Sequence, residues 1–254
     1  MPQRSRALSR RLAAGRTGGE PGTYGYVVAG IDHTYESHAT AFPDGRVTTC
    51  LARDARRRGS GFWEKVAAGR AGDACLLLGE LTGAHPAWPG AGPIDPSRMA
   101  MAGHSAAIAA MLADSRIRAG IDMDGATVAP IPGHGLSRPF LFLGKQSNYT
   151  PGSGGAVTAW ERDWTLLTGW KRWLAVAGAV HAFFTDLALL ADQTGIDIGA
   201  GLPGARTLDI TRAYARAFFD RHLRSTPQAP LDQPSPRYPE VTFCSPQSGR
   251  RQCR

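Results

Sequence analysis

The 254-residue sequence lacks the long apolar runs that a membrane-spanning helix requires. Because no stretch of about 18 consecutive apolar residues occurs, we expect no transmembrane segment. The first twenty residues are basic and contain no apolar core segment, so they do not predict a secretion signal. From this start alone, the expected location is cytoplasmic.

Cysteine is scarce. The chain has four, Cys50, Cys75, Cys244 and Cys253, with no Cys-x-x-Cys spacing and no accompanying cluster of histidines. Cysteine-based metal sites depend on such spacing, so the sequence predicts no metal site. Free thiols and a single disulfide late in the chain are both compatible with these positions.

A basic stripe interleaved with aromatic side chains, which is typical of nucleic-acid-binding surfaces, is also missing. The net charge is +8, but the arginines concentrate near the amino terminus, in residues 52–60 and in residues 248–254. This distribution favours a solvated surface with basic tails and predicts no nucleic-acid partner.

What the chain does contain is an alternation of apolar, strand-like runs with helical segments. The predicted strands are residues 24–33, 46–52, 98–102, 116–125, 138–144 and 171–178, and the predicted helices are residues 60–83, 105–114, 158–170 and 211–223. The second strand is predicted as an edge strand. This order predicts an α/β fold with a mostly parallel sheet flanked by helices.

The predicted domain organisation is simple. We expect an irregular basic leader over residues 1–23 with a short helix at 6–14, one domain over residues 24–243, and a flexible basic tail over residues 244–254. Within the predicted helix 60–83, the candidates for the buried side are Val66, Ala67, Cys75, Leu76 and Leu78. In the closing helix they include Tyr214, Phe218 and Leu223.

The stretch MAGHSAAIAA, residues 101–110, places a serine between a predicted strand and a predicted helix. Gly103, His104 and Ser105 match the first part of the Gly-x-Ser-x-Gly nucleophile elbow, and Ala107 replaces the last glycine. Such a turn exposes the serine hydroxyl at the carboxyl ends of the strands and directs the next N–H, here that of Ala106, at a developing oxyanion. The alternative is a serine that only caps the helix.

A serine nucleophile needs a base and an orienting carboxylate. Of the seven histidines, only His181 follows the predicted strand 171–178 and precedes the closing helix. The loop KQSNYTPGSGGAVTA contains no acid, so we look to Asp124, at the carboxyl end of the strand after the Ser105 helix. Asp122 lies deeper in that strand, where a buried carboxyl needs its own partner. The order Ser, Asp, His is that of the α/β-hydrolases.

Several segments resemble one family. GHS…ADSRIRAGIDMDG, RPFLFLG, GWKRWLAVAGAVHAFFTD and AYARAFFDRHL, together with GYVVAGIDHTYES and FPDGRV, are similar to bacterial relatives of plasma-type (isoform II) platelet-activating factor acetylhydrolase. The resemblance covers residues 24–243. It implies an α/β-hydrolase fold and a metal-free, cofactor-free serine esterase. The implied substrates are short or oxidised acyl esters of phospholipids, or related small esters, with transient contact with a lipid surface. Relatives of this kind are often exported, which leaves the compartment open.

Two features depart from the family pattern. The elbow usually reads Gly-His-Ser-x-Gly-Gly, whereas GHSAAIAAMLAD is about four residues shorter, roughly one helical turn. The family also carries strands and a glycine-containing loop before GYVV, and that loop supplies one of the two oxyanion N–H donors. We therefore expect an amino-terminally incomplete hydrolase with Ala106 as its one identifiable donor. Losing one donor typically costs on the order of 10²–10³ in rate.

The resulting hypothesis is a serine ester hydrolase with Ser105, His181 and Asp124 as its triad. One alternative is a catalytically impaired or truncated homologue that keeps only the fold and a pocket. Another is an acyltransferase or polyester hydrolase that shares the triad. The sequence makes no prediction of acyl length, head group or oligomeric state.

Overall fold

The structure is a computed structural model that describes residues 24–52, 61–247 and 250–253. The predicted leader, with its helix at 6–14, lies outside these residues. The chain divides between Ile94 and Asp95 into two compact units, where the sequence predicts one domain over residues 24–243. Within the described part of the chain, no helix combines the length and the apolarity needed to cross a membrane.

The first unit contains a small hairpin and one long helix. Strands β1 (Ala39–Ala41) and β2 (Val47–Thr49) pair antiparallel across a turn in which Gly45 has a φ of 81°. The predicted edge strand 46–52 is therefore confirmed as β2. Helix α2 (Phe62–Thr82) confirms the predicted helix 60–83, and a short 3-10 turn, η1 (Pro89–Ala91), follows it.

Two predictions for this unit are wrong. Residues 24–33 are coil rather than a buried strand, with Val27 and Val28 45% and 59% exposed. Apolar composition alone does not decide burial, because a buried strand needs a neighbouring strand to pair with. The buried side of α2 also differs from the predicted one: it consists of Ala67, Ala71, Ala74, Leu77 and Leu81, so that only Ala67 was predicted. Apolar residues occupy neighbouring faces of α2, and the sequence alone does not indicate which of these faces is buried.

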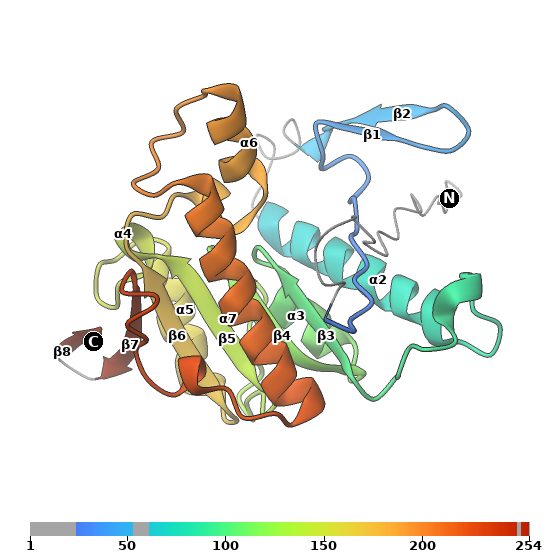
Figure 1. The fold of residues 1–254 in the computed structure, drawn as a ribbon. Helices are drawn as coiled ribbons and strands as arrows, with labels where there is room; N and C mark the ends of the chain where they lie inside the picture. Colours follow the sequence, from blue (N-terminus) through green and yellow to red (C-terminus); the bar gives the residue numbers. More distant parts are fainter. Residues whose placement is uncertain (1–23, 53–60, 248–249, 254) are drawn as a thin grey trace. The chain divides into compact units, whose positions relative to one another are not determined.

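The second unit is built on a six-stranded sheet with the order β3-β4-β5-β6-β7-β8 (Figure 1). The strands are β3 (Met99–Gly103), β4 (Ile117–Met123), β5 (Phe140–Lys145), β6 (Lys171–Val176), β7 (Val241–Gln247) and β8 (Arg250–Cys253). Strands β3 to β6 are mutually parallel, and β7 and β8 are antiparallel additions. The four parallel strands confirm the predicted strands 98–102, 116–125, 138–144 and 171–178.

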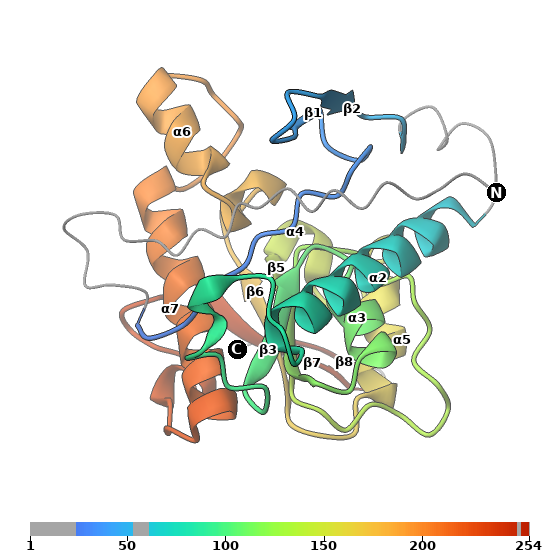
Figure 2. The same ribbon diagram turned by 90° about the vertical axis from the view of Figure 1, so that its right-hand side faces the viewer.

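Helices cover both faces of this sheet. Figures 1 and 2 show α7 (Gly204–Arg224) on one face and α3 (Ala107–Ala113) and α5 (Val157–Leu166) on the other. Residues 140–143 of β5 and 173–176 of β6 are fully buried. That is expected of parallel strands covered on both faces, and it explains why their sequences are continuously apolar.

The closing helix is longer than predicted. Helix α7 begins at Gly204 instead of Thr211, directly after Pro203. The added turns are amphipathic too, with Thr207 and Ile210 buried, which continues the 3- and 4-residue spacing of the predicted positions. The predicted core residues Tyr214, Phe218 and Leu223 are buried, as expected. The shorter elements are α4 (Gln146–Tyr149), η2 (His181–Phe184), α6 (Leu187–Thr194) and η3 (Ala229–Leu231).

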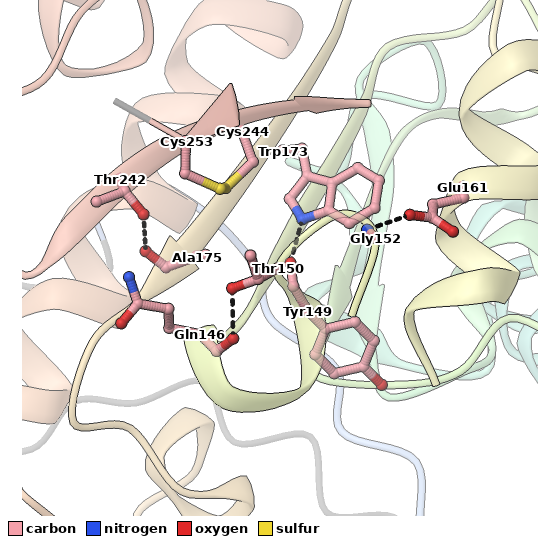
Figure 3. The surroundings of a disulfide bond; sticks show 10 residues. All are labelled: Gln146, Tyr149, Thr150, Gly152, Glu161, Trp173, Ala175, Thr242, Cys244 and Cys253. Carbon is pink, nitrogen blue, oxygen red and sulfur yellow. Dashed lines mark hydrogen bonds between the residues drawn. A yellow bond between two sulfur atoms is a disulfide. The ribbon is translucent and has the colours of Figure 1, made fainter. Parts of the chain in front are cut away.

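The segment predicted as a flexible tail, residues 244–254, contains the end of β7 and the whole of β8. Cys244 and Cys253 lie directly opposite each other in the register of these strands and form a disulfide. Figure 3 shows the disulfide beside Trp173 of β6. Of the two states that the sequence left open, the structure shows the disulfide, and Cys50 is a free thiol.

An aromatic cluster fixes the helix α5 on the sheet. The Trp160 ring stacks on Phe142 of β5 and on Tyr149 of α4, with centroid distances of 4.5 and 3.9 Å. The Trp173 indole, 5.3 Å from that of Trp160, donates to the Tyr149 carbonyl at 2.9 Å (Figure 3). This packing holds α4 at the carboxyl end of β5 and α5 against one face of the sheet.

Candidate active site

Ser105 occupies a tight turn between strand β3 and helix α3. Its φ is 62°, a left-handed conformation that is unfavourable for a residue with a side chain. Such strained backbone positions cluster at functional sites, and a strand-to-helix turn of this kind is the nucleophile elbow of hydrolases. The N-cap of α3 is Ala106, and the helix has no side-chain cap hydrogen bond. Ser105 is therefore not the capping serine of the alternative interpretation.

His181 and Asp124 are hydrogen-bonded. Asp124 follows β4, His181 begins the turn η2 after β6, and the distance from His181 Nδ1 to Asp124 Oδ2 is 2.7 Å. The Asp124 side chain is 1% exposed, whereas that of His181 is 64% exposed. The second carboxylate oxygen, Oδ1, accepts the Lys145 N–H at 2.8 Å. A buried carboxylate with one oxygen held by the backbone and the other on an accessible imidazole can orient that imidazole.

The elbow lies beside this pair. The imidazole rings of His104 and His181 are 4.7 Å apart between centroids. On the other side, Gly125, which follows Asp124, is so close to the elbow that an added Cβ would lie 2.6 Å from Ser105 Oγ. The structure therefore brings the three predicted triad residues to one edge of the sheet, at the carboxyl ends of β3, β4 and β6.

Asp122 lies beneath the elbow and is fully buried. Its Oδ1 accepts the Ser105 N–H at 3.2 Å, so this carboxyl contacts the elbow, while Asp124 bonds His181. Burial raises the pKa of Asp122 well above its usual range, and the nearby carboxyls of Asp124 and Asp163 raise it further. The N–H groups of Ser105 and Gly125 act in the opposite direction.

Helix α5 holds the loop that carries the acid. The Trp160 Nε1–H donates to the Gly125 carbonyl at 2.7 Å. Two residues further on, the Thr127 hydroxyl donates to the buried Asp163 carboxylate, and Arg162 donates to the Thr127 carbonyl at 3.0 Å. Sequence reasoning missed these supporting residues. The available signal was the Asp-Gly dipeptide after a buried strand, which indicates a tight turn but does not reveal its partners.

The remaining predicted groups are placed as follows. Gly103 ends β3, and Ala106, the predicted oxyanion donor, is the buried N-cap of α3. In the described residues, no group of three or more His, Cys, Asp or Glu side chains is arranged to hold a metal ion.

Comparison with known proteins gives two informative similarities, while no protein-family model matches the chain. The chain is 27% identical over 244 aligned residues to a probable 1-alkyl-2-acetylglycerophosphocholine esterase of Arthroderma benhamiae, covering 86% of this chain and 59% of the relative. A solved structure of a ferulic acid esterase from Streptomyces cinnamoneus superposes with a TM-score of 0.75 at 37% identity, covering 85% of this chain and 64% of that one.

The chain thus spans about three fifths of the length of each of these proteins. The sheet order, the helices on both faces and the superposition on an esterase agree with one another. The resemblance to the platelet-activating factor acetylhydrolases is confirmed by the curated relative, whose name describes that type of esterase. The protein has the α/β-hydrolase fold that its sequence predicts.

Proposed function

We propose that this chain is a serine ester hydrolase in which Ser105 is the nucleophile, His181 the general base and Asp124 the orienting acid. The observation that carries the proposal is the 2.7 Å hydrogen bond between His181 and Asp124, formed beside a serine in the elbow conformation. The similarity to two proteins named as esterases supports the same reaction class.

In the proposed reaction, Ser105 Oγ attacks the carbonyl carbon of the ester, and its proton passes to His181 Nε2. The tetrahedral oxyanion is stabilised by the Ala106 N–H. When the C–O bond breaks, the leaving alcohol takes the proton from Nε2, and the acyl group remains on Ser105. Water then attacks the acyl-enzyme with the same proton transfers, which releases the carboxylic acid and regenerates Ser105.

Asp124 contributes to this cycle by favouring the His181 tautomer that carries its proton on Nδ1. Its Oδ2 accepts from Nδ1–H, so the Nε2 lone pair is available to receive the serine proton. Because the Lys145 N–H holds Oδ1, the carboxylate cannot rotate freely away from the imidazole. When His181 becomes an imidazolium, the buried negative charge beside it stabilises the positive charge.

For the substrate, we propose short acyl esters, including the acyl esters of phospholipids, with no metal ion and no cofactor. The name of the curated relative specifies an acetyl ester of glycerophosphocholine, and that of the solved structure a ferulic acid ester. The chemistry common to both is the hydrolysis of a carboxylic ester.

The test measures p-nitrophenyl acetate turnover by the wild type and by Ser105→Ala. Ser97→Ala is the matched control, because Ser97 precedes the opposite end of the same strand. We expect Ser105→Ala to lose on the order of 10³-fold or more in kcat, and Ser97→Ala to lose none. A fluorophosphonate probe should label Ser105 of the wild type.

Turnover that is unchanged in Ser105→Ala would refute the proposal. An unlabelled wild type with a cooperative thermal melt would instead support the impaired homologue, which keeps the fold and a pocket only.

A further inference from the structure

The Asp122 carboxyl has no role in the proposed reaction, yet it lies directly beneath the nucleophile. Asp122 pairs with Gly103 of β3 and Phe142 of β5 in the register of the sheet and is fully buried. Its Oδ1 accepts the Ser105 N–H at 3.2 Å, and Gly125 lies against the same oxygen, because a Cβ added to Gly125 would be 2.7 Å from it. One side chain thus contacts both of the turns that carry the reacting groups.

Both of these turns are strained. Ser105 has a φ of 62° and Asp124 a φ of 52°. A residue with a side chain keeps such a conformation only when its surroundings hold it there. Ser105 itself donates its N–H to the Asp122 carboxyl, and Gly125, the residue after Asp124, packs against the same oxygen. The carboxyl group of Asp122 therefore links the two strained turns to each other.

The free-energy cost of burying the Asp122 carboxyl indicates that this residue does more than fill space. Its second oxygen, Oδ2, has no hydrogen-bond partner among the described residues. An unsatisfied buried polar atom destabilises a fold, and an apolar side chain of similar size would avoid that cost. A residue selected only for packing would not need an acceptor at this position.

We propose that Asp122 is a positioning residue whose carboxyl oxygen holds the nucleophile turn and the acid turn together, so that Ser105 stays aligned with the Asp124–His181 pair. This inference rests on the proposed function for its effect on rate. The link between the two turns can be measured without any substrate.

Substitution of Asp122 by asparagine distinguishes the role of the acceptor oxygen from that of the charge. Asp122→Asn keeps a carbonyl oxygen of the same size in place, whereas Asp122→Ala removes it. The amide has the size of the carboxyl group, keeps one acceptor oxygen and carries no charge. Asp114→Ala is the matched control, because Asp114 is also buried but precedes the opposite end of β4, where it binds Arg116.

The experiment combines p-nitrophenyl acetate kinetics with hydrogen exchange at the amides of residues 105 and 125. We expect Asp122→Ala to lower kcat by about 100-fold, the typical effect of a displacement of about 1 Å, with KM changed less than about threefold. Exchange at these two amides should accelerate selectively. Asp122→Asn should restore both the rate, within about fivefold, and the protection, and Asp114→Ala should change neither.

The inference is overturned if Asp122→Ala keeps its kcat and the protection of both amides, or if Asp122→Asn is as impaired as Asp122→Ala. If Asp122→Ala does not fold, the decision rests on Asp122→Asn: retained kcat and protection support the inference, and their loss overturns it. If the wild type neither turns over substrate nor labels at Ser105, the proposed function fails. The exchange measurement then still decides whether Asp122 holds the two turns.

Discussion

Gly125→Ala offers a sharp test of the site, because one added methyl group enters the space between the nucleophile and the acid. A Cβ at this position would lie 2.2 Å from the Ser105 nitrogen, 2.6 Å from Ser105 Oγ and 2.7 Å from Asp122 Oδ1. The φ of Gly125 is not in the left-handed region, so the backbone itself accepts alanine. The effect of the substitution is therefore one of space.

The required movement can be worked out from these contacts. Real Cβ atoms do not approach other heavy atoms within 3.0 Å, so the distance to the Ser105 nitrogen must grow from 2.2 Å to at least 3.0 Å, or about 0.8 Å. A displacement of about 1 Å in a catalytic group can cost about 10²-fold in rate, equivalent to about 2.7 kcal/mol in the activation free energy. Overpacking of this kind also lowers the free energy of unfolding by about 1–3 kcal/mol.

The assay is kcat and KM on p-nitrophenyl acetate, together with thermal unfolding. The control is Gly133→Ala, in the same unit, where an added Cβ would meet no atom within 4 Å. We expect Gly125→Ala to lose about 100-fold in kcat with little change in KM, and Gly133→Ala to resemble the wild type. A Gly125→Ala enzyme with wild-type kcat would refute the placement of Ser105 beside the loop after β4.

Three further predictions concern the acid, the disulfide and the half-buried His222. Asp124→Asn should lower kcat by about 10⁴-fold, because an amide favours the wrong His181 tautomer. Asparagine tolerates the left-handed backbone at this position, so the fold should be kept. A rate near that of the wild type would exclude the triad. Cys253→Ser, which breaks the Cys244–Cys253 bond, should lower the free energy of unfolding by about 3 kcal/mol, the effect of a disulfide that closes a short loop. It should leave kcat unchanged, because β8 is an edge strand of the sheet. Denaturant titration measures the stability, and an unchanged midpoint would contradict the prediction. Burial lowers the pKa of His222 to about 4, so between pH 6.5 and pH 4 the unfolded chain binds a proton that the folded chain does not, and stability falls as the pH falls through this window. The melting temperature of His222→Phe should therefore depend less on pH in this window than that of the wild type. An equal dependence would contradict this origin.

Much of the second unit could be predicted from the sequence. Strands β3 to β6 are predominantly apolar runs, and residues 107–113 have high helix propensity, so the local pattern is sufficient for both. The candidate triad was predictable for a related reason. Reacting groups in parallel sheets lie at the carboxyl ends of strands, and Ser105, Asp124 and His181 each follow one.

Other features depended on contacts between residues distant in the sequence. The run at residues 24–33 is as apolar as a strand, yet Val27 and Val28 are exposed, and the buried stripe of α2 is next to the one predicted. The pairing of Cys244 with Cys253 depends on the β7–β8 register, which gives the predicted tail its strands. Burial and strand pairing are properties of the neighbours that tertiary structure supplies, so local periodicity cannot determine them.

By itself, the sequence determined the order of the central elements, the α/β class and the three candidate reacting groups, because each follows from apolar period and position along the chain. Only the tertiary structure showed that the acid of the His181 pair is Asp124, and that Asp122 instead accepts the Ser105 N–H of the strained elbow. These two aspartates are two residues apart on one strand end. What distinguishes them is which backbone or side-chain group lies within hydrogen-bond distance, and only the folded chain decides that.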